Sequence, residues 1–94
     1  MKHGYDKDAL IKRLHRIEGQ VRGIERMVEE GRYCIDILTQ IAAVSTALES
    51  ASLKLLEDHV RHCVADALAS GDPHAAQEKS RELLDAVQRF ARTR

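Results

Sequence analysis

Two histidines and a cysteine lie close together in "EDHVRHC", residues 57–63, and both residue types are common metal ligands. His59 and Cys63 are four residues apart, so on an α-helix their side chains lie on the same face. His62 is adjacent to Cys63 and points about a quarter of a turn away. The pair alone is a weak signal, because buried histidines are often hydrogen-bonded core residues and a buried cysteine often acts as a small hydrophobe.

The other cysteine of the chain, Cys34, lies far back in the sequence. No Pro or Gly occurs between Gly31 and Gly71, so we expect one helix through this region. At ~1.5 Å per residue, Cys34 and His59 would be about 37 Å apart on it. Metal–ligand bonds are about 2.0–2.3 Å long, so these two residues of one chain cannot bind the same ion.

Pairing of two chains would remove this difficulty. In an antiparallel dimer that crosses near Ala47 or Leu48, Cys34 of one subunit would lie beside His59 and Cys63 of the other. Two-fold symmetry would then produce two identical sites, one at each end of the paired helices. The spacing therefore predicts a Cys-His-Cys site at a subunit interface.

Two thiolates and one imidazole form a soft donor set. This set suits Cu(I) with three ligands, or Zn(II) or Ni(II) if a fourth ligand joins. The candidates for the fourth ligand are His3, His62 or water. We expect Cu(I), with Ni(II) or Zn(II) as the alternative.

The elements that position these residues are helices. Apolar residues step by four and three through the first helix, which we expect to begin near Asp6 or Asp8 and to stop at Gly31: Leu10, Leu14, Ile17, Val21, Ile24 and Val28. The long middle helix should end at "SGDP", where Asp72 is the expected N-cap of the last helix and Pro73 its first residue. There is no strand pattern. The sequence predicts one all-α domain, residues 1–94, with residues 1–5 and 91–94 mobile.

The middle helix of about 35 residues would be roughly 50 Å long. The first and last helices are too short to cover its apolar stripe, so we expect self-association. A break near "VSTALESAS" is the alternative, and it would permit a compact monomeric bundle.

The length and the charge of the chain exclude some classes of function. The chain has 94 residues and a formal net charge of zero, so any surface that binds nucleic acid must be local. No segment reaches the roughly 18 apolar residues of a membrane span, and residues 1–10 do not resemble a signal peptide. We therefore expect a cytoplasmic protein in which both cysteines are thiols.

A local basic surface is present on the first helix. Residues 10–23 carry four basic side chains and one acid, Glu18, and a further lysine on the middle helix extends the group: Lys12, Arg13, Arg16, Arg22 and Lys54. Such a patch can neutralise DNA phosphates, although from the charges alone a solvated helix face is the more common explanation. Few aromatic residues are present to stack on unpaired bases, so duplex DNA is favoured over single strands or RNA.

Two segments, "RLHRIEGQVRGIERMVEEGRYCIDILTQIAAV" and "DHVRHCVADAL", resemble the CsoR/RcnR family of metal-sensing transcriptional repressors. The likeness covers about residues 7–90. The ordered set of Cys34, His59 and Cys63 is similar to the ligand set of the copper-sensing branch. The resemblance implies a different ligand set for nickel and cobalt sensors, with histidine at the last position and a further histidine near the N-terminus. His3 lies one residue from the position of that N-terminal histidine.

The resemblance implies an antiparallel dimer that forms a four-helix bundle and pairs into a tetramer, without a helix-turn-helix. It implies that the metal-free tetramer binds operator DNA, with Arg13 as the most direct match, and that metal releases it. Tyr33 and Glu82 match residues that orient the metal-binding imidazole in the copper branch. Some relatives have a basic residue in the middle of the long helix, where this chain has Ser50 and Leu53.

We therefore predict a Cu(I)-responsive repressor of copper efflux and homeostasis genes. The alternatives are a nickel- or zinc-responsive repressor of the same family and a copper buffer or chaperone that does not bind DNA. A metalloenzyme needs an open ligand position and a base beside a substrate pocket. His62 or Glu57 could serve as the base, but the sequence indicates no such pocket, so we do not expect an enzyme.

Overall fold

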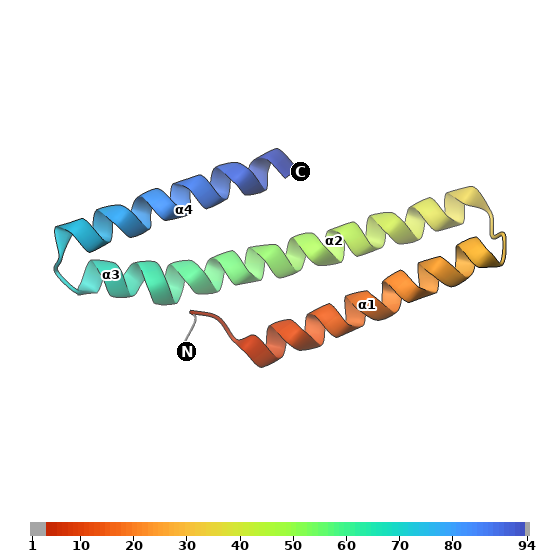
Figure 1. Ribbon diagram of the computed structural model, residues 1–94, viewed down its shortest axis with the longest axis horizontal. Helices are drawn as coiled ribbons and strands as arrows, with labels where there is room; N and C mark the ends of the chain where they lie inside the picture. The colour runs from red at the N-terminus through yellow and green to blue at the C-terminus, as the bar shows by residue number, and fades with distance from the viewer. Residues whose placement is uncertain (1–3, 94) are drawn as a thin grey trace. The chain divides into compact units, whose positions relative to one another are not determined.

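The computed structural model describes residues 4–93, with side-chain surroundings for residues 4–90. It is all-α, as predicted, and contains no strand within residues 4–93 (Figure 1). The elements, in chain order, are α1 (Lys7–Glu29), α2 (Cys34–His59), the π-helix η1 (Val60–Val64), α3 (Ala65–Ala69) and α4 (Pro73–Thr93). The backbone forms two compact units. One is Lys7–Leu55, and the other joins the segment before α1 to the residues from Leu56 onward.

α1 ends in a tight turn at the glycine that the sequence indicated. The Arg32 N–H donates to the Met27 carbonyl at 2.9 Å, and the Gly31 N–H donates to the Val28 carbonyl at 3.1 Å. Gly31 has a φ of 67°. This pair of hydrogen bonds around a left-handed residue is a Schellman motif, which satisfies carbonyls at the end of the helix. The chain can then turn and begin α2 three residues later.

The long middle helix is also present. α2, η1 and α3 follow one another without a break from Cys34 to Ala69, and "VSTALESAS" lies in regular α-helix. The alternative of a break at that stretch is therefore wrong. One feature was not predicted: Val60–Val64 is a π-helix. Such single-turn π segments are rare inside α-helices and occur often at functional sites.

The turn before α4 has the predicted caps. Gly71 has a φ of 76°, a conformation that glycine adopts without strain. The Asp72 Oδ1 accepts the His74 N–H at 3.0 Å, and Pro73 is the first residue of α4. Asp72 is thus the N-cap, and proline takes the position where its missing N–H costs nothing.

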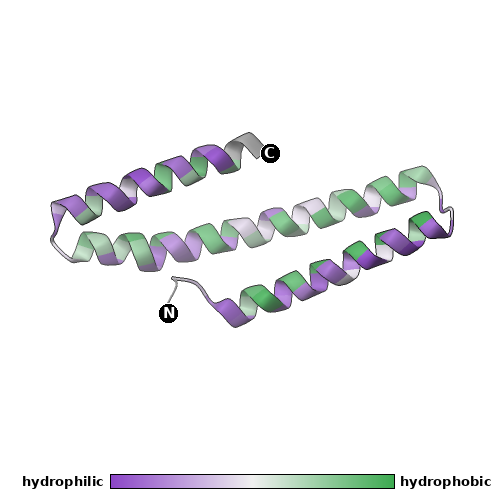
Figure 2. Cartoon of the chain, in the orientation of Figure 1, coloured by the Kyte–Doolittle hydropathy of each residue, from purple (hydrophilic) through white to green (hydrophobic). Residues whose placement is uncertain are grey.

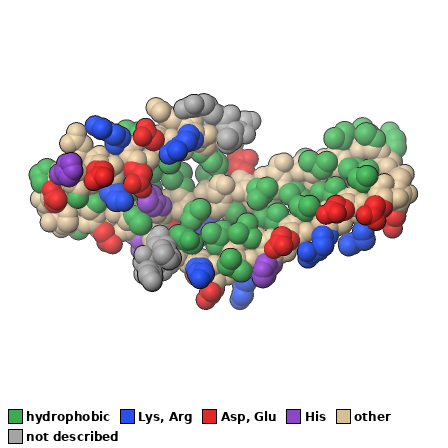
Figure 3. Space-filling model, viewed as in Figure 1, with side chains coloured by type: hydrophobic (Ala, Val, Ile, Leu, Met, Phe, Trp, Pro, Cys, Tyr) green, Lys and Arg blue, Asp and Glu red, His purple; other side chains and the backbone are tan. Residues whose placement is uncertain are grey.

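The described chain buries few apolar side chains. Those that are buried are Ile17, Val44, Ala51 and Val64. Along α1 and α4, hydrophobic and hydrophilic residues alternate in the manner of amphipathic helices (Figure 2). Within Lys7–Leu55, hydrophobic side chains gather on the face shown in Figure 3, and Val28, Leu38 and Ile41 are each about half exposed or more. Exposed apolar side chains that gather on one face are typical of interaction sites.

Among the helices that the structure describes, none is both long enough and apolar enough to cross a membrane.

Candidate metal centre

His59 is the last residue of α2, and its imidazole contacts α4. The Nε2 of His59 lies 3.2 Å from the Oε1 of Glu82, and the two side chains are 28% and 48% exposed. When Nε2 donates its hydrogen to the carboxylate, the other ring nitrogen, Nδ1, keeps the lone pair that can bind a metal. A ligating histidine usually has its second nitrogen fixed in this way, since the partner sets both the tautomer and the ring orientation.

Glu82 is held on its other side by a residue that the sequence analysis missed. The Nζ of Lys79 lies 3.4 Å from the Oε2 of Glu82, so the carboxylate lies between an imidazole and an ammonium group. The two residues are three positions apart on α4, and this spacing was the signal that could have indicated the pair.

Cys63 lies within the π-helix and is partly buried. The expectation that His59 and Cys63 share a regular α-helix is wrong, because the chain changes to π-helix directly after His59. The π-helical hydrogen bond joins residues five apart, so the angle between these two side chains differs from that of an α-helix. Gly4, before α1, packs directly against the Sγ of Cys63.

Cys34 is the first residue of α2, and Tyr33 precedes it. The Tyr33 carbonyl accepts the N–H groups of Asp36 and Ile37, at 3.0 and 3.2 Å, which starts the helix. Both side chains are exposed, that of Tyr33 by 68%. The helical rise of α2, at ~1.5 Å per residue, separates Cys34 from His59 by about 37 Å.

In the described part of the chain, no three His, Cys, Asp or Glu side chains come together in a group that could hold a metal ion. His62, a candidate fourth ligand, is partly buried in η1. His3, the other candidate, lies outside the described residues.

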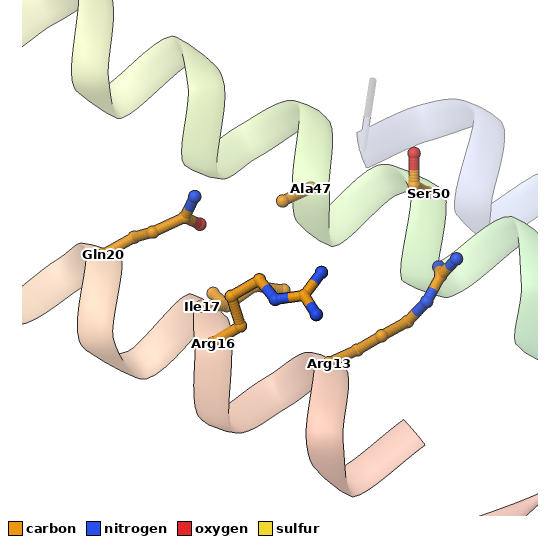
Figure 4. Close-up of a pocket in the computed structure, with 6 residues that line it drawn as sticks. All are labelled: Arg13, Arg16, Ile17, Gln20, Ala47 and Ser50. Carbon is orange, nitrogen blue, oxygen red and sulfur yellow. The ribbon is translucent and has the colours of Figure 1, made fainter. Parts of the chain in front are cut away.

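Two arginines of α1, Arg13 and Arg16, border a groove of about 280 Å³ between α1 and the middle of α2. Its lining residues are Arg13, Arg16, Ile17, Gln20, Ala47 and Ser50. In Figure 4 the arginine side chains extend from α1 toward α2. Within residues 4–90 neither Arg13 nor Arg16 forms an ion pair, so both guanidinium groups can accept an anionic partner. The other candidate DNA-binding side chains are also exposed: Lys12, Arg22 and Lys54.

A family model described as "Metal-sensitive transcriptional repressor" matches residues 6–89. This chain belongs to that family. It is 52% identical to the copper-sensing transcriptional repressor CsoR of Bacillus subtilis (strain 168), over 98% of this chain and 88% of the relative. It is 54% identical to the copper-sensing transcriptional repressor RicR of Mycobacterium tuberculosis, over 97% of this chain and 96% of the relative.

Two solved structures share the fold. The crystal structure of the copper-sensing repressor CsoR with Cu(I) from Geobacillus thermodenitrificans matches with a TM-score of 0.82 and 50% identity, over 89% of this chain and 84% of that chain. The nickel-responsive transcriptional regulator InrS matches with a TM-score of 0.80 and 39% identity, over 90% and 92%. Proteins of this family are repressors and not enzymes, in agreement with the sequence-based prediction.

Proposed function

We propose that this chain is a Cu(I)-responsive transcriptional repressor of copper efflux and homeostasis genes. The observation that carries the proposal is the soft donor set Cys34, His59 and Cys63 in a chain at least half identical to two relatives named as copper-sensing repressors. Thiolate sulfur and imidazole nitrogen favour Cu(I) over hard cations. The contact between His59 and Glu82 supports the same assignment, since it leaves one ring nitrogen for the metal.

The proposed site requires two chains. The length of α2 prevents Cys34 from reaching His59 of its own chain, so Cys34 of the partner subunit would complete the site in an antiparallel dimer. The apolar side chains that remain exposed on α1 and α2 support such pairing, because two copies can cover one another's stripes. Pairing of two dimers would produce a tetramer. The chain would act in the cytoplasm as a single domain.

The DNA partner would be duplex operator DNA, bound in the absence of metal. The arginines of the groove, Arg13 and Arg16, would contact phosphates, together with the neighbouring exposed basic residues Lys12, Arg22 and Lys54. A tetramer would repeat this surface four times, which compensates for the zero net charge of the chain.

Release of DNA would follow from the position of Glu82 on α4. His59 holds Glu82 through Nε2, so a change in the orientation of the imidazole on metal binding would pull on α4 through this contact. We expect Tyr33, beside Cys34, to contribute from the partner subunit. By linkage, DNA must weaken copper binding by the same free energy by which copper weakens DNA binding, commonly ~1–3 kcal/mol.

A nickel-responsive repressor is the second candidate. It is favoured by the structural likeness to the nickel-responsive regulator InrS and by the two histidines, His3 and His62, that could add a fourth ligand. Zn(II) would require the same four-coordinate arrangement.

The test is an anaerobic titration of the protein on labelled promoter DNA with Cu(I), and with Ni(II) and Zn(II) in parallel. Cu(I) should release the DNA at the lowest free concentration of the three metals. Cys34→Ala should keep its DNA affinity in the absence of metal and lose the release by Cu(I). A Cys34→Ala protein that still responds fully to Cu(I) would contradict the assignment of the site, and release by Ni(II) alone would favour the second candidate.

A further inference from the structure

The segment before α1 lies against the proposed metal ligand Cys63. Gly4 is buried, and a Cβ added to it would collide with the Sγ of Cys63. The next nearest atoms to such a Cβ are the Cβ atoms of Cys63 and His62, each at 3.8 Å. The backbone at Gly4 therefore covers one side of the sulfur.

Two independent features require glycine at this position. The first is space, because the Sγ of Cys63 occupies the place of a side chain. The second is backbone conformation: the φ of Gly4 is 78°, in the left-handed region that other L-residues adopt only with strain. Gly71 has nearly the same φ, 76°, but among the described residues, its two chain neighbours apart, no atom lies within 4 Å of the place of its Cβ. The two glycines thus share the conformation and differ in the contact.

We infer that Gly4 determines metal specificity by closing one side of Cys63. This inference rests on the proposed function, in which Cys63 is a ligand. Cu(I) bound by two thiolates and one imidazole needs no further ligand, whereas a structural Zn(II) site is almost always tetrahedral with four. Backbone packed on the sulfur leaves less room around a metal at Cys63 and so disfavours the fourth ligand. The glycine would select for the metal that has the fewest ligands.

The first test uses the metal-free protein and concerns the packing alone. The alkylation rates of Cys63 and Cys34 by iodoacetamide are measured separately by peptide mass mapping in the wild type, in Gly4→Ala and in Gly71→Ala. Gly4→Ala should displace the segment from the sulfur and speed alkylation of Cys63 by roughly five- to thirtyfold. This is the increase in the displaced population that the left-handed backbone strain of alanine alone would produce. The rate at Cys34 is the internal reference and should not change.

Gly71→Ala is the matched control, because it introduces the same backbone strain without the collision. It should leave the rate at Cys63 unchanged. Gly4→Asn is a second variant, since asparagine tolerates the left-handed region better than alanine while it keeps the collision. If Cys63 reacts at the wild-type rate in both Gly4 variants, the packing of Gly4 on the sulfur is refuted.

The second test concerns specificity. Affinities for Cu(I) and Zn(II) are measured by competition with chelators, and Gly4→Ala should raise the affinity for Zn(II) relative to Cu(I) by about tenfold or more. A fall in relative Zn(II) affinity would overturn the inference, because it would mean that the segment supplies a ligand. Failure of the wild type to bind Cu(I) through Cys63 would refute the proposed function instead, and the alkylation rates would still decide whether Gly4 packs on the sulfur.

Discussion

Replacement of Glu82 by glutamine tests the contact by which metal binding would reach α4. Glutamine has nearly the same size and shape, and its carbonyl oxygen can still accept a hydrogen bond from the Nε2 of His59. The substitution removes the negative charge 3.2 Å from the ring. It also removes the ion pair with Lys79, in which the Nζ lies 3.4 Å from the carboxylate.

The magnitude follows from the strength and the exposure of this contact. A hydrogen bond to a charged group contributes about 1.5–3 kcal/mol, roughly twice as much as a neutral one. The side chains of His59 and Glu82 are 28% and 48% exposed, so solvent screens the charge and the lower end of this range applies. We expect a loss of about 1.4 kcal/mol, which is tenfold in Cu(I) affinity. This agrees with the ~10- to 100-fold effect of removing the partner of a metal-binding histidine.

The assay is a competition titration of Cu(I) against a chelator, followed by the same titration in the presence of operator DNA. In the absence of metal, Glu82→Gln should bind operator DNA with wild-type affinity. Its release from the DNA should require more Cu(I). The matched control is Glu78→Gln, also on α4. Glu78 lies 4.0 Å from His74, and both side chains are well exposed, at 70% and 86%. This control should behave as the wild type in both measurements.

Unchanged Cu(I) affinity and unchanged release in Glu82→Gln would refute the reasoning, because the charge at Oε1 would then have no part in metal binding. A weakened affinity with a normal extent of release at saturating Cu(I) would be a different result. It would keep Glu82 as a partner of His59 but remove it from the path to the DNA-binding surface.

Three further predictions concern the surfaces and the fold. Arg13→Ala should weaken operator binding, and the slope of log affinity against log salt concentration should become shallower by about 0.9 for each phosphate that the protein no longer neutralises. The control Arg81→Ala, on α4, should change neither the affinity nor the slope. If the two variants had equal effects, the DNA-binding surface would lie elsewhere. Ile41→Glu replaces an apolar side chain that is 46% exposed by a charged one and should dissociate the proposed dimer in sedimentation velocity, whereas the neighbouring Gln40→Glu should not. Asp72→Ala removes the N-cap of α4 and should lower the free energy of unfolding in urea by about 1 kcal/mol; an unchanged midpoint would contradict the capping role.

The helices could be predicted from the sequence because their signals are local. Gly31 and the pair Asp72–Pro73 act through backbone conformation and hydrogen bonds within a few residues, and the structure shows a helix end or start at each of them. The absence of Pro and Gly between residues 31 and 71 likewise predicted the continuous middle helix. The π-helix at Val60–Val64 could not be predicted in this way, since no residue type specifies it.

The candidate site could likewise be predicted from the sequence only in part. The sequence by itself determined the kinds of donor atom and, through the rise of a helix, that Cys34 and His59 of one chain are too far apart to share an ion. Only the tertiary structure decided which nitrogen of His59 meets Glu82 and that Gly4 packs on Cys63. The physical reason is that ligand chemistry and helical rise are properties of residue type and local backbone. Contacts between segments 20 to 60 residues apart depend on how helices and turns pack, which no local pattern encodes.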